Sequence, residues 1–136
     1  MKSYDFLSNN NQYFSETDQE VFCWEKNYQL FAYKRMYTLS KNVDYLHFAM
    51  EVFQNSMLKK LIEGNTSYKL ELLTKKVDVL YLLGLHYFSI DRRAAIDYFL
   101  SAKQIIGKFP KCSLDAHLLD LCSKLDSYVQ NSAYAI

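Results

Sequence analysis

The sequence predicts an all-α fold of about five antiparallel helices, and three observations support this class. The chain has 136 residues but one proline and three glycines, too few to punctuate a fold of short strands and tight turns. Apolar residues recur at spacings of three and four along most of it. Residues 79–90 are apolar except for His86 and Ser89. Because a membrane span needs roughly 20 apolar residues, we expect this stretch to be a central buried helix.

Residues 1–16 are expected to form a flexible N-terminal arm, because they include a polar, turn-prone run, and residues 17–136 a single all-helical domain. The first helix is predicted from Thr17, as its cap, to about Leu39. Two apolar sides are expected on it, which indicates two neighbours, or one neighbour and a partner protein. One side is Val21, Trp24, Tyr28 and Phe31, and the other is Leu30, Tyr33 and Tyr37.

The second helix is predicted over residues 43–63, with Ser40 or Asn42 as its cap and Gly64 ending it in the left-handed conformation. Its apolar stripe is the most regular in the chain and indicates an amphipathic helix on a core. The stripe comprises Val43, Leu46, Met50, Phe53, Met57 and Leu61.

The third helix is predicted from Ser67 through the apolar stretch, with Gly84 in its middle. A glycine there costs about 1 kcal/mol relative to alanine, which makes sense if another helix approaches its backbone closely. The fourth helix, from Arg92 to about Ile106, is expected to begin after the cap Asp91 and to end at Gly107. The fifth is expected to be capped by Ser113. Its stripe is Leu114, Leu118, Leu121, Leu125 and Tyr128.

The third and fourth helices carry a pattern of small and aromatic residues over about residues 77–110. It consists of Leu83, Gly84, Tyr87, Ala95, Phe99, Ala102 and Pro110. This pattern resembles the tetratricopeptide repeat, and the related Sel1-like repeat shares its Leu-Gly and aromatic spacing. The resemblance implies helical hairpins that bind other proteins, with the fifth helix as a C-terminal capping helix. The first two helices are either a degenerate first copy or an unrelated pair.

The sequence holds no pattern typical of a catalytic, cofactor or metal site. Cys112, His117 and Cys122 are spaced by five, so they do not share a helix face as zinc ligands would. Three cysteines make an odd number, which favours a reducing, cytoplasmic location. A net charge of +1 argues against nucleic-acid and membrane partners.

The repeat resemblance implies a non-enzymatic protein-interaction module, such as a small adaptor or chaperone, with a peptide or helix of a partner protein in an aromatic-lined groove. Tyrosine suits such a groove, although it also fills cores whose edges reach water. The alternative is a structural subunit that uses its aromatic face as a permanent interface, for example in a homodimer. The expected contact residues are Tyr28, Tyr33, Tyr37, Tyr81, Tyr87, Arg92 and Arg93.

Overall fold

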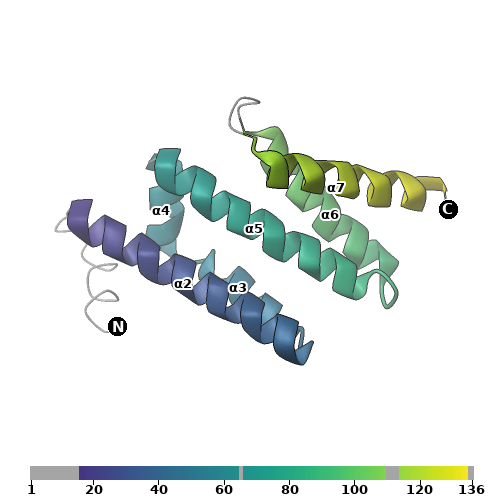
Figure 1. The fold of residues 1–136 in the computed structure, drawn as a ribbon, viewed down its shortest axis with the longest axis horizontal. Helices are drawn as coiled ribbons and strands as arrows, with labels where there is room; N and C mark the ends of the chain where they lie inside the picture. The colour runs from purple at the N-terminus through teal and green to yellow at the C-terminus, as the bar shows by residue number, and fades with distance from the viewer. Residues whose placement is uncertain (1–15, 65, 110–113, 135–136) are drawn as a thin grey trace. The chain divides into compact units, whose positions relative to one another are not determined.

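The computed structural model describes residues 16–64, 66–109 and 114–134, and every regular element among them is an α-helix (Figure 1). The helices are α2 (Glu16–Ser40), α3 (Asp44–Val52), α4 (Ser56–Gly64), α5 (Thr66–Tyr87), α6 (Arg92–Gly107) and α7 (Ala116–Tyr134). The predicted all-α class is confirmed for these residues. None of the helices in this part of the chain combines the length and the apolar character that crossing a bilayer requires.

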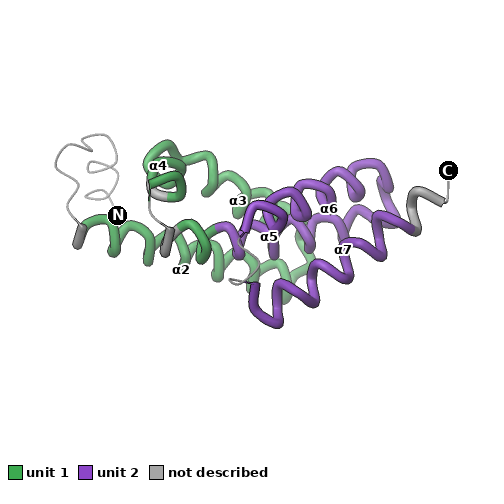
Figure 2. Tube along the Cα trace, turned by 90° about the horizontal axis from the view of Figure 1, so that it is seen from above, with its two compact units in different colours: residues 1–72 green, residues 73–136 purple. Residues whose placement is uncertain are grey.

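The chain divides into two compact units, residues 1–72 and residues 73–136, and the division falls inside α5 (Figure 2). The single domain expected over residues 17–136 stays a prediction. The expected N-terminal arm lies outside the described residues except for Glu16, which already belongs to α2.

In the first unit, α3 folds back along α2, and the rings of Tyr33 and Phe48 lie 5.8 Å apart between the two helices. The chain reverses at Lys41, which has a φ of 60° and donates its backbone N–H to the carbonyl of Tyr37 at 2.7 Å. This is the left-handed residue that commonly ends a helix. Val43 takes the N-cap position without a side-chain bond, and Asn42 Oδ1 instead accepts the N–H of Asp44 at 3.0 Å.

The predicted second helix over residues 43–63 is wrong as a single element, because the chain breaks between α3 and α4. Asn55 explains the break. Its Oδ1 accepts the backbone N–H of Leu58 at 3.0 Å, and its carbonyl accepts that of Lys59 at 3.0 Å, so Asn55 caps a new helix. The apolar stripe survives the break in part, since Leu46, Phe53 and Met57 are buried.

In the second unit, α6 and α7 pack side by side (Figures 1 and 2). The predicted cap at Asp91 is confirmed, because its Oδ1 accepts the N–H of Ala94 at 3.2 Å. The fifth-helix stripe is also confirmed at its centre, where Leu118, Leu121 and Leu125 are buried. The close approach expected at Gly84 is made by Phe99, which lies directly against the glycine backbone, and Ala95, Phe99 and Ala102 have no exposed surface.

Two predicted helix caps, and the conformation predicted for one glycine, are wrong. Thr17 lies inside α2, which begins at Glu16, so it is not the cap. Gly64 ends its helix as predicted, but it has no positive φ, so the expected left-handed conformation is wrong. The predicted end of the fourth helix at Gly107 is confirmed, because α6 runs from Arg92 to Gly107. Asp115 replaces Ser113 as the cap of α7, since its Oδ1 accepts the N–H of Leu118 at 2.9 Å, while residues 110–113, Ser113 and Pro110 included, lie outside the described residues.

Candidate functional site

One side of α2 exposes large apolar side chains that the rest of the first unit does not cover. Trp24 is 69% exposed, Tyr28 62%, Phe31 59% and Leu39 75%. At 100° per residue these positions, with the exposed Arg35 between them, fall on one face of the helix. We call Trp24, Tyr28, Phe31, Arg35 and Leu39 the α2 stripe.

The opposite side of α2 is buried, through Phe22, Cys23, Leu30 and Tyr37. The expectation that the helix has two apolar sides is therefore confirmed, and the structure decides which of them faces the core. The side with Leu30 and Tyr37 is buried, and the side with Trp24, Tyr28 and Phe31 faces outward. Exposed apolar residues that stand singly are normal on protein surfaces, but a continuous row of them is typical of an interaction site.

The two halves of the α2 stripe differ in shape. Towards the N-terminus, the rings of Trp24 and Tyr28 stack at 5.9 Å with an interplanar angle of 23°. Towards the C-terminus there is a shallow open pocket lined by Phe31, Lys34, Arg35, Thr38 and Leu39. The Thr38 hydroxyl already donates to the carbonyl of Lys34 at 2.9 Å. The pocket therefore has apolar walls and the exposed cationic side chain of Arg35.

The three predicted contact residues on α2 have different surroundings. Tyr28 belongs to the α2 stripe and is exposed. Tyr33 is half-buried against the ring of Phe48, and Tyr37 is only 9% exposed, with Lys41 Nζ over its ring at 5.7 Å. Burial raises the pKa of the Tyr37 hydroxyl. Tyr28 is therefore the most exposed of these three rings.

The predicted contact residues Tyr81 and Tyr87 lie in an aromatic cluster within the second unit. Tyr128 stacks on Phe99 at 4.9 Å, and Tyr81 lies 6.1 Å from Phe99 and 6.4 Å from Tyr128. Tyr87 stacks on Tyr98 at 5.8 Å. Burial, followed by the nearby Tyr128, raises the pKa of Tyr81. Both tyrosines are half-buried, so most of their contacts are internal to this unit.

Arg92 and Arg93 are both exposed at the start of α6. The guanidinium of Arg92 lies 4.5 Å from the centre of the Phe88 ring, which is the geometry of a cation–π contact. Arg92 therefore neighbours the aromatic cluster of the second unit, since the Phe88 ring lies 6.3 Å from that of Phe99. Tyr28, Tyr33 and Tyr37 belong to the first unit, and the structure gathers each group of predicted residues separately.

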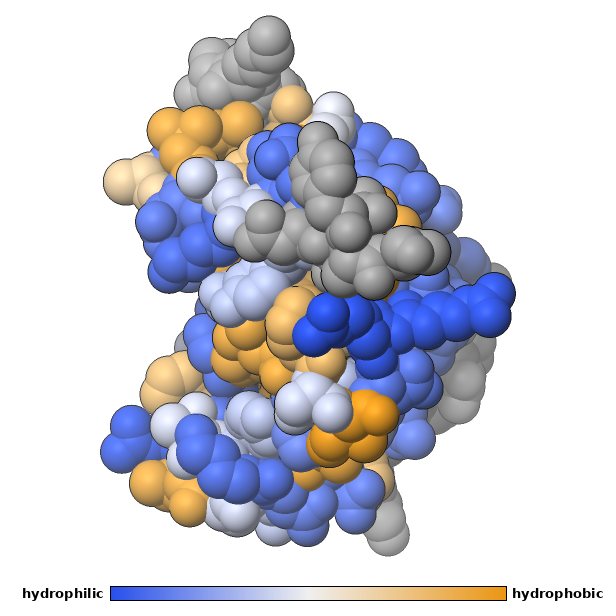
Figure 3. All heavy atoms as spheres, turned by 90° about the vertical axis from the view of Figure 1, so that its right-hand side faces the viewer, coloured by the Kyte–Doolittle hydropathy of each residue, from blue (hydrophilic) through white to orange (hydrophobic). Residues whose placement is uncertain are grey.

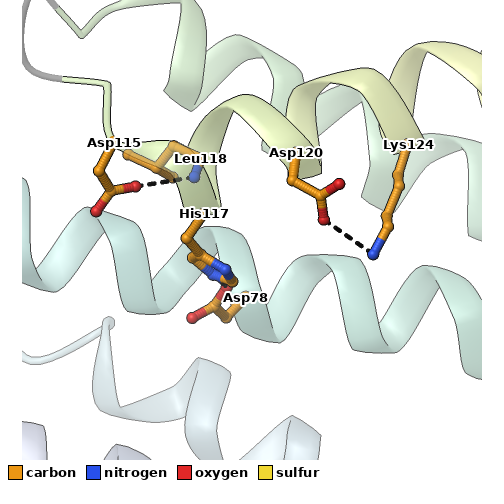
Figure 4. A network of polar contacts seen from close by, with 6 residues as sticks. All are labelled: Asp78, Asp115, His117, Leu118, Asp120 and Lys124. Carbon is orange, nitrogen blue, oxygen red and sulfur yellow. Dashed lines mark hydrogen bonds and ion pairs between the residues drawn. The ribbon is translucent and has the colours of Figure 1, made fainter.

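The polar contacts nearest to a catalytic arrangement lie at the start of α7 (Figure 4). His117 Nε2 lies 2.7 Å from Asp78 Oδ1 of α5, with the imidazole side chain 53% exposed and the carboxylate 17%. Asp120 and Lys124 form an ion pair at 3.0 Å one turn further on. Across the described residues no three His, Cys, Asp or Glu side chains converge as metal ligands, and Cys112 lies outside them. The His117–Asp78 contact joins two helices.

Sequence reasoning placed Trp24 and Phe31 on an apolar side of the first helix, but did not name them, Arg35 or Leu39 as contact residues. The sequence did contain one signal that this side of α2 faces outward. The outward row is interrupted by a charge at Arg35, whereas the buried positions Leu30 and Tyr37 carry none. A charge in line with apolar residues marks the side of a helix that reaches water.

Comparisons with protein-family models, with curated proteins and with solved structures gave no match to this chain.

Proposed function

We propose that this protein is a non-enzymatic protein-interaction module that holds an amphipathic helix or peptide of a partner protein on its α2 stripe. The observation that carries the proposal is the row of four apolar side chains between 59% and 75% exposed on one face of α2. Large aromatic residues dominate binding energy at protein interfaces, because they bury much area with few rotatable bonds.

The surface suits a helix better than an extended chain. An extended segment gains its affinity from main-chain hydrogen bonds to the edge of a sheet, and the described residues form helices only. A partner helix can instead lay its apolar side along the rings of Trp24, Tyr28 and Phe31. Arg35 at the pocket favours a partner with a carboxylate at the matching end.

The proposal includes a tetratricopeptide-like hairpin formed by α5 and α6. The contact of Phe99 with the backbone of Gly84 supports it, as does the complete burial of Ala95 and Ala102, because these residues carry the repeat-like pattern. The proposed location is the cytoplasm. The odd number of cysteines supports this, as do the free thiols of Cys23 and Cys122.

A photo-cross-linking residue placed at Phe31 tests this function in the cells that make the protein. We expect one dominant partner to be captured from this position. The capture should be lost when Trp24→Asp is added, because a charge in the apolar row has to be desolvated on binding. Trp24 is exposed, so this change leaves the fold intact.

The matched control uses Leu119, a 55% exposed apolar residue on α7. The same probe at Leu119 should not capture the partner, and Leu119→Asp should not disturb capture from Phe31. Equal capture from both positions, or capture from Phe31 that survives Trp24→Asp, would show that the α2 stripe is not the binding surface.

A further inference from the structure

The face of α2 that bears the α2 stripe carries opposite charges on the two sides of its three aromatic residues. Glu20 is exposed and lies one turn before Trp24, and Arg35 is exposed and lies one turn after Phe31. At 100° per residue, Glu20, Trp24, Tyr28, Phe31 and Arg35 fall within an arc of about 80°. From the N-terminal to the C-terminal end of α2, this face therefore carries an acidic residue, then three aromatic residues, then a basic residue.

These two charges are too far apart to pair within one chain. Fifteen positions separate Glu20 from Arg35, which is about 22 Å along a helix axis. Neither residue makes an ion pair or a side-chain hydrogen bond with another residue in the described part of the chain. Their charges are therefore open to a ligand that covers the α2 stripe.

We propose that the α2 stripe takes a second copy of this chain, with the two α2 helices antiparallel, so that Glu20 of each copy lies beside Arg35 of the other. This inference rests on the function proposed above and names the partner. A two-fold interface brings the same patch of both copies together, so the patch has to complement itself. An acidic end and a basic end on either side of an apolar centre meet that requirement.

The register of this pairing follows from the spacing. If Glu20 is level with Arg35 of the second copy, then Trp24 is level with Phe31, and Tyr28 lies next to the two-fold axis. All three aromatic residues of the stripe then face aromatic residues. A parallel pairing would instead place Glu20 beside Glu20 and Arg35 beside Arg35, and like charges in contact oppose association.

The exposed area indicates a modest affinity. With about 150–250 Å² for each large aromatic side chain, the exposed parts of Trp24, Tyr28 and Phe31 amount to roughly 400 Å² per copy. Two copies would bury roughly 800 Å² from these rings, below the 1,200–2,000 Å² of stable interfaces. On the face drawn in Figure 3, the hydrophobic residues form separate patches among hydrophilic ones. We therefore expect a reversible dimer with a micromolar dissociation constant.

Sedimentation equilibrium of the full chain between about 1 and 500 µM measures this dimer. Glu20→Arg and Arg35→Glu should each weaken it by roughly 2- to 30-fold, because the two-fold axis makes every change act at two like-charged contacts. An equimolar mixture of the two variants should dimerise about as tightly as the natural chain, since both arginines of one variant then meet glutamates of the other. The double variant E20R/R35E should recover dimerisation as well.

Matched controls are Glu51→Arg on α3 and Lys60→Glu on α4, which make the same charge changes at exposed positions outside the stripe. They should leave dimerisation unchanged. A chain that stays monomeric throughout the range overturns the proposal, and so does a mixture of the two single variants that dimerises no better than either one alone. A monomer whose Phe31 probe still captures a different protein overturns the second copy as partner and leaves the proposed function standing.

Discussion

The ring of Phe99 on α6 lies directly against the backbone of Gly84 on α5. A Cβ built on Gly84 would approach ring carbons of Phe99 to 2.6 and 2.7 Å, closer than side chains tolerate. Phe99 has no exposed surface, and its ring also stacks on Tyr128 of α7 at 4.9 Å. The glycine therefore lets three helices of the second unit meet around one ring.

Replacement of Gly84 by alanine should destabilise the protein by about 1–3 kcal/mol, because the added methyl group has to displace a buried ring. This loss outweighs the gain in helix propensity of about 1 kcal/mol. Gly107→Ala is the matched control, since a Cβ there meets nothing within 4 Å. Urea unfolding compares the two variants, and equal stabilisation by both would refute the close contact.

A second variant distinguishes crowding from other effects of the glycine. Phe99→Leu removes the ring that the new methyl group would strike. The cost of Gly84→Ala should therefore be smaller in a Phe99→Leu background than in the natural chain, with a coupling of about 0.5–3 kcal/mol typical of residues in contact. Additive free energies of unfolding would show that the two residues act independently.

The residues around Gly84 show how much of the fold the sequence predicts. A glycine inside a long apolar helix costs stability, and small residues at Ala95 and Ala102 suggest a close neighbour, so the contact was predictable from local chemistry. Which residue would make this contact was not predictable. The atoms nearest to a Cβ at Gly84 belong to the large ring of Phe99 and not to either of the small alanines. Which side chain fills a gap depends on three-dimensional packing.

The break between α3 and α4 was not predictable from apolar spacing. Leu46, Phe53 and Met57 keep a helical spacing across it, and all three are buried. The signal was Asn55, because asparagine favours helix caps over helix interiors. The regular apolar stripe continues past Asn55, and it predicted one uninterrupted helix.

Asn55→Ala should lower the free energy of unfolding by about 1 kcal/mol, within the range of roughly 0.5–2 kcal/mol found for helix caps. The physical reason is the bond from the Leu58 N–H to Asn55 Oδ1 at 3.0 Å, which alanine cannot make. Asn55→Asp keeps an acceptor there and should retain most of the stability. Gln54→Ala, at the exposed neighbouring position, is the control, and an equal loss from Gln54→Ala and Asn55→Ala would contradict the cap.

Cys23 should make the protein less stable in alkali. Burial, and secondarily the charge of Glu71, raises the pKa of its thiol from 9.0 to about 11. Between these values the unfolded chain loses the proton while the folded chain keeps it, so stability falls as pH rises. The loss at pH 11 approaches the roughly 2–3 kcal/mol that a shift of this size represents. Burial also raises the pKa values of three tyrosines, Tyr37, Tyr81 and Tyr98. Their ionisation adds to the loss of stability at high pH.

Chemical denaturation at pH 9 and at pH 11 measures this effect. The decline in the free energy of unfolding should be smaller in Cys23→Ala than in the natural chain, even though the substitution lowers stability at both values. Cys122→Ala is the control, because Cys122 is only half-buried and its replacement should leave the decline unchanged. Identical declines in all three proteins would show that the Cys23 thiol is not protected.

The outward side of α2 marks the limit of what the sequence could predict about the site. Both sides of the helix are apolar, and periodicity alone gives the spacing of a face without its direction. All three residues at positions 28, 33 and 37 are tyrosines, yet Tyr33 and Tyr37 lie against the rest of the unit whereas Tyr28 is exposed. The direction depends on which side α3 covers, and the chain enters α3 through the reversal at Lys41.

Trp24 should report the state of the α2 stripe directly, because it is the only tryptophan in the chain and is 69% exposed. In dilute solution its fluorescence should be red-shifted and readily quenched by acrylamide. As the protein concentration rises through the micromolar range, burial against Phe31 of a second copy should shift the emission to shorter wavelength and reduce quenching. Phe31→Asp should abolish the concentration dependence, and Leu119→Asp should leave it intact. Emission that is already blue-shifted and protected in the dilute monomer would mean that the chain itself covers Trp24, and that the α2 stripe is not free to bind.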